Sequence, residues 1–307
     1  MSANPSAIIF ISGDAHPKLA AEIAAELQLS VSSAAVATFA DGETRVHIEA
    51  DVRDAVVVIV QPTSPPVNDH LVSLALLADA AKAAGADCII AVVPYFGYSR
   101  QEQRSAVGDA RSARLAANLL GMSGIDRLIT LDLHVPALES AFPLSVTLLQ
   151  PDELFLPVIR GIANLTIVAP DAGGMKRAQR FAGRLDAELA VVAKIRSGPD
   201  AVAVSGVLGN VRGRECVIVD DMASTGRTLA LAAEALRDAG ADAVHAVFTH
   251  PVMAEGAIER LLAAPIKQLV TSDSIPPPEH PRIQVVPIAS LLAAAVRNVS
   301  GLNVLIL

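Results

Sequence analysis

The stretch Val217-Ile-Val-Asp-Asp-Met-Ala-Ser-Thr-Gly-Arg-Thr228 is followed directly by the run Leu229-Ala-Leu-Ala-Ala-Glu-Ala-Leu236. Its first residues are apolar and β-branched, which predicts a buried strand, whereas the run after Thr228 has the composition and spacing of a helix. A strand that passes through a short glycine-containing turn into a helix is the repeating unit of a parallel α/β sheet. This stretch therefore predicts an α/β fold.

The same alternation continues along the rest of the chain. Short β-branched runs are separated by Ala/Leu-rich runs, so we expect mainly parallel sheets flanked by helices. The predicted strands are Ala7–Ser12, Ala34–Phe39, Ala55–Val60, Cys88–Val93, Leu128–Leu131, Leu165–Ala169, Leu189–Lys194, Cys216–Val219, Val244–Thr249 and Gln268–Thr271. The predicted helices are Pro17–Gln28, Val67–Ala84, Ala110–Leu120, Gly174–Leu185, Thr228–Ala239 and Ile288–Arg297.

The length of 307 residues allows two domains of ordinary size. Two predicted strands end in similar polar groups, Thr130-Leu-Asp-Leu-His134 and Ile218-Val-Asp-Asp-Met222. This likeness predicts two similar domains, residues 1–148 and 149–307, with a boundary in the proline-flanked segment between Phe142 and Pro151.

Composition limits the function classes. Hydrophobic residues make up 52% and charged residues 18%, which is unlike a disordered chain. The apolar runs are too short for a bilayer helix and no signal peptide is recognisable, so we expect no membrane partner and a cytoplasmic location. The net charge of −8 argues against nucleic acid as a partner. Cys88 and Cys216 stand in strand-like runs, which predicts buried, reduced thiols.

The turn that follows Val219 has the chemistry of a phosphate site. Backbone N–H groups at a helix amino terminus favour an anion, and the hydroxyls of Ser224, Thr225 and Thr228 add donors. Asp220 and Asp221 beside such a site suit sugar hydroxyls or a Mg²⁺-bound water. An ordinary strand-to-helix turn with a Ser or Thr cap is the alternative. The motifs GxxxxGK[ST] and GxGxxG occur nowhere in the chain, which argues against a P-loop NTPase and against a dinucleotide-binding dehydrogenase.

A hydrophobic strand, two acids and a Thr-Gly-x-Thr turn resemble the phosphoribosyl-pyrophosphate (PRPP) motif of proteins with the type I phosphoribosyltransferase fold. Further motifs, in order and spacing, resemble the ribose-phosphate pyrophosphokinase (PRPP synthetase) family. They are Phe39-Ala-Asp-Gly-Glu-Thr-Arg-Val46, Val92-Val-Pro-Tyr-Phe-Gly-Tyr-Ser-Arg-Gln101, Leu131-Asp-Leu-His134, Ala169-Pro-Asp-Ala-Gly-Gly174, Thr249-His-Pro251 and Val270-Thr-Ser-Asp-Ser-Ile275.

Several of these motifs also have a plain structural explanation. Asp41-Gly42 is a hairpin turn signal, so the residues around it could serve the hairpin alone. The cluster Tyr95-Phe-Gly-Tyr98 suits a nucleotide, with Arg100 placed for phosphate oxygens, but it could equally be a loop with packed aromatic residues. Asp132 and His134 are two apart at a strand end, which predicts that they point to the same side.

Two further positions have equally plain alternatives. Asp171 precedes two glycines and a predicted helix, which is also an N-cap pattern. Lys194 and Arg196 end a strand before the Gly/Pro segment Ser197-Gly-Pro-Asp200, and a solvated pair of charges would have the same sequence.

The family resemblance implies a set of roles. It implies ATP binding by Phe39, Asp41, Gly42, Glu43, Arg100, Gln101 and His134. It implies ribose 5-phosphate binding by Arg196, Asp220, Asp221, Ser224, Thr225, Gly226, Arg227 and Thr228. It also implies catalytic roles for Lys194 and Arg196 on a loop that closes over the transferring group, and a Mg²⁺ site at His134 and Asp171.

The reaction that the resemblance implies transfers the β,γ-pyrophosphoryl group of Mg-ATP to the 1-hydroxyl of ribose 5-phosphate. The resemblance also implies that the chain associates with copies of itself. A phosphoribosyltransferase that consumes PRPP, and a non-catalytic paralogue that restrains a true synthetase, are the alternatives. The chain also departs from the family. Ser224 stands where many members have Asp, and Glu102–Ala110 lacks the Arg-rich pattern of phosphate-activated members. These two departures resemble the class of synthetases that lacks allosteric control by phosphate and ADP.

Overall fold

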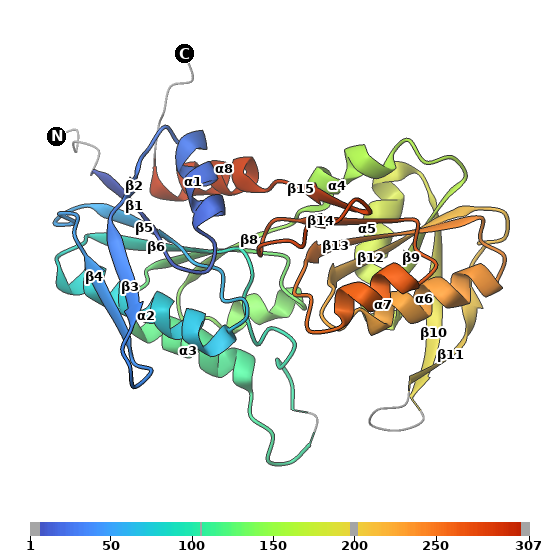
Figure 1. Ribbon diagram of the computed structural model, residues 1–307, viewed down its shortest axis with the longest axis horizontal. Helices are drawn as coiled ribbons and strands as arrows, with labels where there is room; N and C mark the ends of the chain where they lie inside the picture. Colours follow the sequence, from blue (N-terminus) through green and yellow to red (C-terminus); the bar gives the residue numbers. More distant parts are fainter. Residues whose placement is uncertain (1–6, 105, 197–201, 302–307) are drawn as a thin grey trace. The chain divides into compact units, whose positions relative to one another are not determined.

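The computed structural model describes residues 7–104, 106–196 and 202–301 (Figure 1). The chain divides into two compact units, one formed by the residues up to Gln150 together with those from Ile288 onward, and the other by Pro151–Pro287. Each unit has its own sheet with helices packed on both faces. The predicted α/β class is confirmed.

The first unit contains a six-stranded sheet in the order β2-β1-β5-β6-β7-β8, with every neighbouring pair parallel. A separate antiparallel hairpin is formed by β3 and β4. The elements are β1 (Ile8–Ser12), α1 (Pro17–Glu26), β2 (Val31–Ser32), β3 (Ala34–Thr38), β4 (Thr44–Ile48), β5 (Val56–Val60), α2 (Val67–Ala83), β6 (Cys88–Val93), α3 (Ser112–Met122), β7 (Arg127–Leu131), η1 (Pro136–Ala141), β8 (Ser145–Leu149) and α8 (Ala289–Ser300).

The second unit contains a seven-stranded sheet in the order β11-β10-β9-β12-β13-β14-β15, parallel except for the β10–β11 pair. Its elements are α4 (Asp152–Ile159), β9 (Leu165–Ala169), η2 (Ala172–Gly174), α5 (Met175–Leu185), β10 (Glu188–Arg196), β11 (Val202–Leu208), β12 (Glu215–Met222), α6 (Arg227–Asp238), β13 (Ala243–His250), α7 (Ala257–Ala263), β14 (Gln268–Ser272) and β15 (Ile283–Val286).

The core strands explain why the apolar runs lack alternation. In β5 the residues from Val57 to Val60 are all buried, because helices cover both faces of a parallel sheet. Cys216 is buried within β12, and burial raises the pKa of its thiol to about 11. Cys88 is free, as the sequence predicts, but it is only partly buried. Among the described residues, no helix combines the length and the apolar character needed to cross a bilayer.

Each predicted strand and helix is present, with ends that differ by at most three residues. The units do not follow the predicted division at residue 148 in every respect. Helix α8 lies in the predicted second domain, yet it packs against α1 in the first unit. There the Arg297 guanidinium donates a hydrogen bond to the carbonyl oxygen of Glu26. The last helix therefore belongs to the unit that contains the amino-terminal strand.

Candidate active site

The phosphate turn, Ala223–Thr228, connects the end of β12 to the first residues of α6 at the carboxyl edge of the second sheet. Ligands of open α/β sheets bind at this edge. Gly226 precedes the first helical residue with a φ of +72°. A Cβ atom there would lie 2.8 Å from Cγ of Leu261 and 3.0 Å from the carbonyl oxygen of Ala257. The turn therefore requires glycine for both its dihedral angle and its space.

The turn is held from behind by the loop that follows β13. The N–H of Ala223 donates to the His250 carbonyl at 3.0 Å, and the N–H of Met253 donates to the Ala223 carbonyl at 2.9 Å. The N–H of Ala254 donates to the Ser224 carbonyl, also at 2.9 Å. These backbone bonds fix the path of the turn.

The hydroxyl groups of the turn do not form an ordinary helix cap. The capping residue is Gly226, with no side-chain cap bond, and the Thr225 hydroxyl lies 3.5 Å from the Arg227 nitrogen. Ser224 and Thr228 are half-buried, and Thr225 and Arg227 are exposed. The predicted residues from 224 to 228 thus gather at one helix amino terminus, an arrangement that suits a phosphate group.

The two acids that precede the turn are joined by a hydrogen bond. Oδ1 of Asp220 accepts the backbone N–H of Asp221 at 2.9 Å. Burial, together with the neighbouring Asp221 carboxylate, raises the pKa of Asp220 well above its ordinary value of 3.8, and Arg177 on α5 acts in the opposite direction. Asp220 therefore keeps its proton to a higher pH than a solvated aspartate does.

The motif at Phe39 lies at the tip of the β3–β4 hairpin. The N–H of Phe39 donates to the Glu43 carbonyl at 2.8 Å, and Oδ1 of Asp41 accepts the N–H of Glu43 at 3.2 Å. Gly42 has a φ of +93°. These contacts are those of a hairpin turn. The Phe39 ring is nevertheless 50% exposed, so it remains available as an apolar face for a ligand.

The aromatic cluster after β6 is largely core. Tyr95 and Phe96 are buried, and the rings of Phe96 and Phe142 lie 4.9 Å apart. These two side chains therefore pack the first unit rather than face a nucleotide. Arg100 and Gln101 follow them and are exposed, where they can reach a ligand.

Asp132 and His134 lie outside strand β7, so the strand alternation on which the prediction of a shared side was based does not apply to them. Strand β7 ends at Leu131, and Asp132 takes a left-handed conformation with a φ of +47°. Asp132 is buried, and its N–H donates to the Leu149 carbonyl at 3.0 Å, whereas His134 is exposed. The backbone at Asp132 and the difference in exposure therefore arise from the loop after β7 and not from a strand period.

Asp171 and the two catalytic candidates belong to the second unit. Oδ1 of Asp171 accepts the N–H groups of Gly173 and Gly174 at 3.1 and 3.3 Å, which is the N-cap arrangement. The backbones of Lys194 and Arg196 belong to β10, where they pair with β11 next to an irregularity in register. Their side chains, and the segment of residues 197–201, lie outside the described part of the chain.

The donor groups suit magnesium. In the described ranges there is no group of three or more His, Cys, Asp or Glu side chains placed to hold a metal ion. Magnesium needs no such group, because it commonly binds through one or two carboxylates together with substrate phosphates and water. The partly exposed carboxylate of Asp171 provides oxygen atoms of the kind that this ion prefers.

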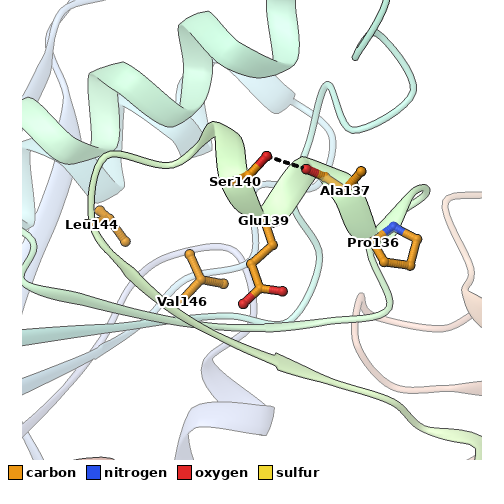
Figure 2. Close-up of a pocket in the computed structure, with 6 residues that line it drawn as sticks. All are labelled: Pro136, Ala137, Glu139, Ser140, Leu144 and Val146. Atoms are coloured by element: carbon orange, nitrogen blue, oxygen red, sulfur yellow. Dashed lines mark hydrogen bonds between the residues drawn. The ribbon is translucent and has the colours of Figure 1, made fainter.

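A cavity of about 450 Å³ in the first unit has none of the predicted site residues in its lining. It is formed by η1 and β8 and lined by Pro136, Ala137, Glu139, Ser140, Leu144 and Val146 (Figure 2). Its one charged lining residue is the carboxylate of Glu139. A lining whose one charge is negative does not suit a phosphate.

The sequence does not identify two arginines that act on the phosphate turn and on the acids before it. Arg177 acts electrostatically on Asp220, and the Arg260 guanidinium donates a hydrogen bond to the Thr225 carbonyl. Both residues stand inside helices, Arg177 in α5 and Arg260 in α7. No local pattern distinguishes them from the other surface arginines of this chain.

Comparison with known proteins is consistent over the whole chain. Residues 8–124 match the model of the N-terminal domain of ribose phosphate pyrophosphokinase, and residues 154–267 match the phosphoribosyl transferase domain. A ribose-phosphate pyrophosphokinase of Neisseria meningitidis serogroup A is 40% identical, covering 98% of this chain and 94% of the relative. One of Bordetella parapertussis is 38% identical, covering 95% and 97%.

A solved structure agrees. The crystal structure of phosphoribosylpyrophosphate synthetase from Mycobacterium smegmatis superposes with a TM-score of 0.88 at 31% identity, covering 96% of this chain and 99% of that one. Both units therefore have the phosphoribosyltransferase type of fold that the turn at Ala223–Thr228 predicts. With matching domain models in both halves and relatives at 40% identity over nearly its full length, the chain belongs to the ribose-phosphate pyrophosphokinase family.

Proposed function

We propose that the protein transfers the β,γ-pyrophosphoryl group of Mg-ATP to the 1-hydroxyl of ribose 5-phosphate, forming PRPP and AMP. The observation that carries this proposal is the glycine-dependent turn at the start of α6, which follows directly on Asp220 and Asp221. This arrangement combines an anion site with two groups that can hydrogen-bond sugar hydroxyls.

Ribose 5-phosphate binds in the second unit. The N–H groups of the turn and the hydroxyls of Ser224, Thr225 and Thr228 hold the 5-phosphate. Asp220 and Asp221 bind the ribose hydroxyls. Burial and the neighbouring Asp221 carboxylate raise the pKa of Asp220, which favours the protonated carboxyl group, a form that can donate a hydrogen bond as well as accept one.

ATP binds through residues of the first unit. The exposed ring of Phe39 covers the adenine, and Asp41 and Glu43 accept hydrogen bonds from the nucleotide. Arg100 and Gln101 bind phosphate oxygens or the ribose. Support for these roles comes from the exposure of these side chains and from the family resemblance of their motifs.

The chemical step forms a bond between O1 of ribose 5-phosphate and the β-phosphorus of ATP. The bond between this phosphorus and the α,β-bridging oxygen breaks, AMP leaves with that oxygen, and the hydroxyl proton passes to solvent. Such a transfer depends mainly on alignment and charge neutralisation. Lys194 and Arg196 stabilise charge on the transferring group. His134 and Asp171 are the residues that would hold Mg²⁺, which neutralises phosphate charge when bound.

Two alternatives predict different products. A phosphoribosyltransferase would consume PRPP, but it gives no role to the amino-terminal half, which matches the pyrophosphokinase N-terminal domain. A non-catalytic paralogue would bind substrates and leave them unchanged. The presence of Lys194, Arg196, His134 and Asp171 together favours an active enzyme.

Product analysis by ³¹P NMR tests the proposal. The full-length protein is incubated with Mg²⁺, ATP and ribose 5-phosphate, and AMP and PRPP are expected in equal amounts. Gly226→Ala, which blocks the turn, is the matched negative control. ADP as the nucleotide product would identify a simple phosphokinase, and no turnover by the wild-type protein would contradict the proposal.

Self-association and a cytoplasmic location are part of the same proposal. Both are supported by the family to which the chain belongs, and both stay predictions. Light scattering of the purified protein measures the first, and fractionation of cells that produce it measures the second.

A further inference from the structure

Two sequence motifs, Thr249-His-Pro251 and Val270–Ile275, have no role in the proposed reaction. The structure brings them together behind the phosphate turn. Strand β13 ends at His250 and β14 ends at Ser272, so both motifs lie at the carboxyl edge of the second sheet. His250 is only 2% exposed, and Ser272 and Ser274 are fully buried.

The buried polar groups form one hydrogen-bonded cluster. Nδ1 of His250 lies 2.8 Å from the Ser274 hydroxyl oxygen. The Ser272 hydroxyl donates to the Thr249 carbonyl at 2.6 Å and accepts the N–H of Ser274 at 3.1 Å. The Ser274 hydroxyl also lies 3.3 Å from the Thr249 carbonyl. We call Thr249, His250, Ser272 and Ser274 the strand-end cluster.

The cluster fixes the end of β13, and the end of β13 fixes the turn. His250 makes both contacts. Its side chain contacts Ser274, and its backbone carbonyl accepts the Ala223 N–H. Farther along the same loop, the N–H groups of Met253 and Ala254 donate to the Ala223 and Ser224 carbonyls. A shift of His250 would therefore move the backbone on which the turn depends.

We propose that His250 and Ser274 are positioning residues that hold the phosphate turn in its binding conformation and thereby set the affinity for ribose 5-phosphate. This inference rests on the proposed binding of the 5-phosphate by the turn. Neither residue is a catalytic residue, because both act through the backbone at residues 223 and 224. Buried polar groups that are fully hydrogen-bonded specify one local geometry, which is the property that a preorganised anion site requires.

A purely structural role would have a different consequence. Loss of a buried hydrogen bond would then lower stability without a selective effect on one substrate. Thr166 provides the comparison, because its fully buried hydroxyl donates to the Asn210 carbonyl at 3.0 Å and accepts from Nε of Arg214 at 2.6 Å. Thr166 lies near the amino end of β9, whereas the strand-end cluster lies at the carboxyl ends of β13 and β14 in the same sheet.

The experiment compares Ser274→Ala and His250→Asn with Thr166→Val in the full-length enzyme. Steady-state kinetics gives kcat and the KM for each substrate, and thermal unfolding gives Tm. For the first two variants we expect the KM for ribose 5-phosphate to rise about fivefold or more, with kcat and the KM for ATP changed by less than about twofold. Thr166→Val should lower Tm by a similar amount and leave every kinetic constant near the wild-type value.

The outcomes separate this inference from the proposed function. Gly226→Ala alters the turn directly, so an unchanged KM for ribose 5-phosphate in that variant would overturn the binding assignment itself. If Gly226→Ala raises this KM and the cluster variants do not, the positioning role is wrong and the assignment stands. Equal effects on both substrates, or the same kinetic change in Thr166→Val, would also overturn the positioning role. Because Ser274→Ala and His250→Asn remove different atoms, either variant suffices if the other does not fold.

Discussion

Oδ1 of Asp220 accepts a hydrogen bond from the backbone N–H of Asp221, and the two carboxyl groups share one strand end. Burial and the Asp221 carboxylate raise the pKa of Asp220 well above 3.8. The strand end directly precedes the phosphate turn, so the protonation of Asp220 is connected both to folding and to the groups that surround the sugar.

The first prediction concerns the pH dependence of stability. Between the ordinary and the raised pKa of Asp220 the folded state binds more protons than the unfolded state, so the free energy of unfolding falls as pH rises through this interval. Asp220→Asn removes the titrating group. We therefore expect the variant to gain stability relative to the wild type as pH rises, measured by urea unfolding from about pH 4 to about pH 9. Asp79→Asn, at an exposed carboxyl on α2, is the control. A stability difference for Asp220→Asn that does not change with pH would contradict this expectation.

The second prediction compares two glycines with nearly the same backbone conformation. Gly226 has a φ of +72° and Gly256 a φ of +73°, but a Cβ atom at Gly226 would lie 2.8 Å from Cγ of Leu261, whereas one at Gly256 would have no atom within 4 Å. Gly256→Ala should cost about 1 to 2 kcal/mol through its left-handed conformation. Gly226→Ala should cost more and should raise the KM for ribose 5-phosphate, as measured by urea unfolding and steady-state kinetics. Equal losses of stability would show that Leu261 moves aside without cost.

The third prediction concerns the hairpin tip. Because Phe39 is 50% exposed, Phe39→Ala should change the free energy of unfolding by less than about 0.5 kcal/mol. Stacking of an aromatic ring on a base contributes about 1 to 3 kcal/mol, so the KM for ATP should rise about tenfold. Leu208→Ala on β11, where the side chain is 65% exposed, is the matched control and should leave this KM unchanged. A similar KM for ATP in both variants would remove Phe39 from the nucleotide site.

The fourth prediction concerns the charge on the transferring group. Lys194→Ala should lower kcat by about a hundredfold or more, because a positioned cation acts mainly on charge that develops in the transition state. The KM for ribose 5-phosphate should stay within about threefold of the wild-type value. Lys18→Ala, at a side chain that is 82% exposed on α1, should change neither constant. An unchanged kcat would exclude Lys194 from the mechanism.

Features that depend on neighbouring residues agree with the sequence predictions. The strand, turn and helix around Gly226 are present, and the Asp41-Gly42 pair forms its hairpin. These features follow from side-chain periodicity and from the few residue types that tolerate a tight turn.

Features that depend on packing do not follow the local pattern. Tyr95 and Phe96 resemble a nucleotide-binding turn in sequence, but they fill the core of the first unit. Asp132 and His134 have the spacing of one strand face, but β7 ends before them. In each case a contact with a segment far along the chain outweighs the local preference.

Local sequence patterns were therefore sufficient for the fold class, for the phosphate turn and for the family to which the chain belongs, because periodicity and turn chemistry operate over a few adjacent residues. The raised pKa of Asp220, the packing of α8 against α1 and the strand-end cluster behind the turn required the folded chain. The burial of Asp220, the contact between the two helices and the buried hydrogen bonds of the cluster arise between residues that are distant in sequence, so no local pattern contains them.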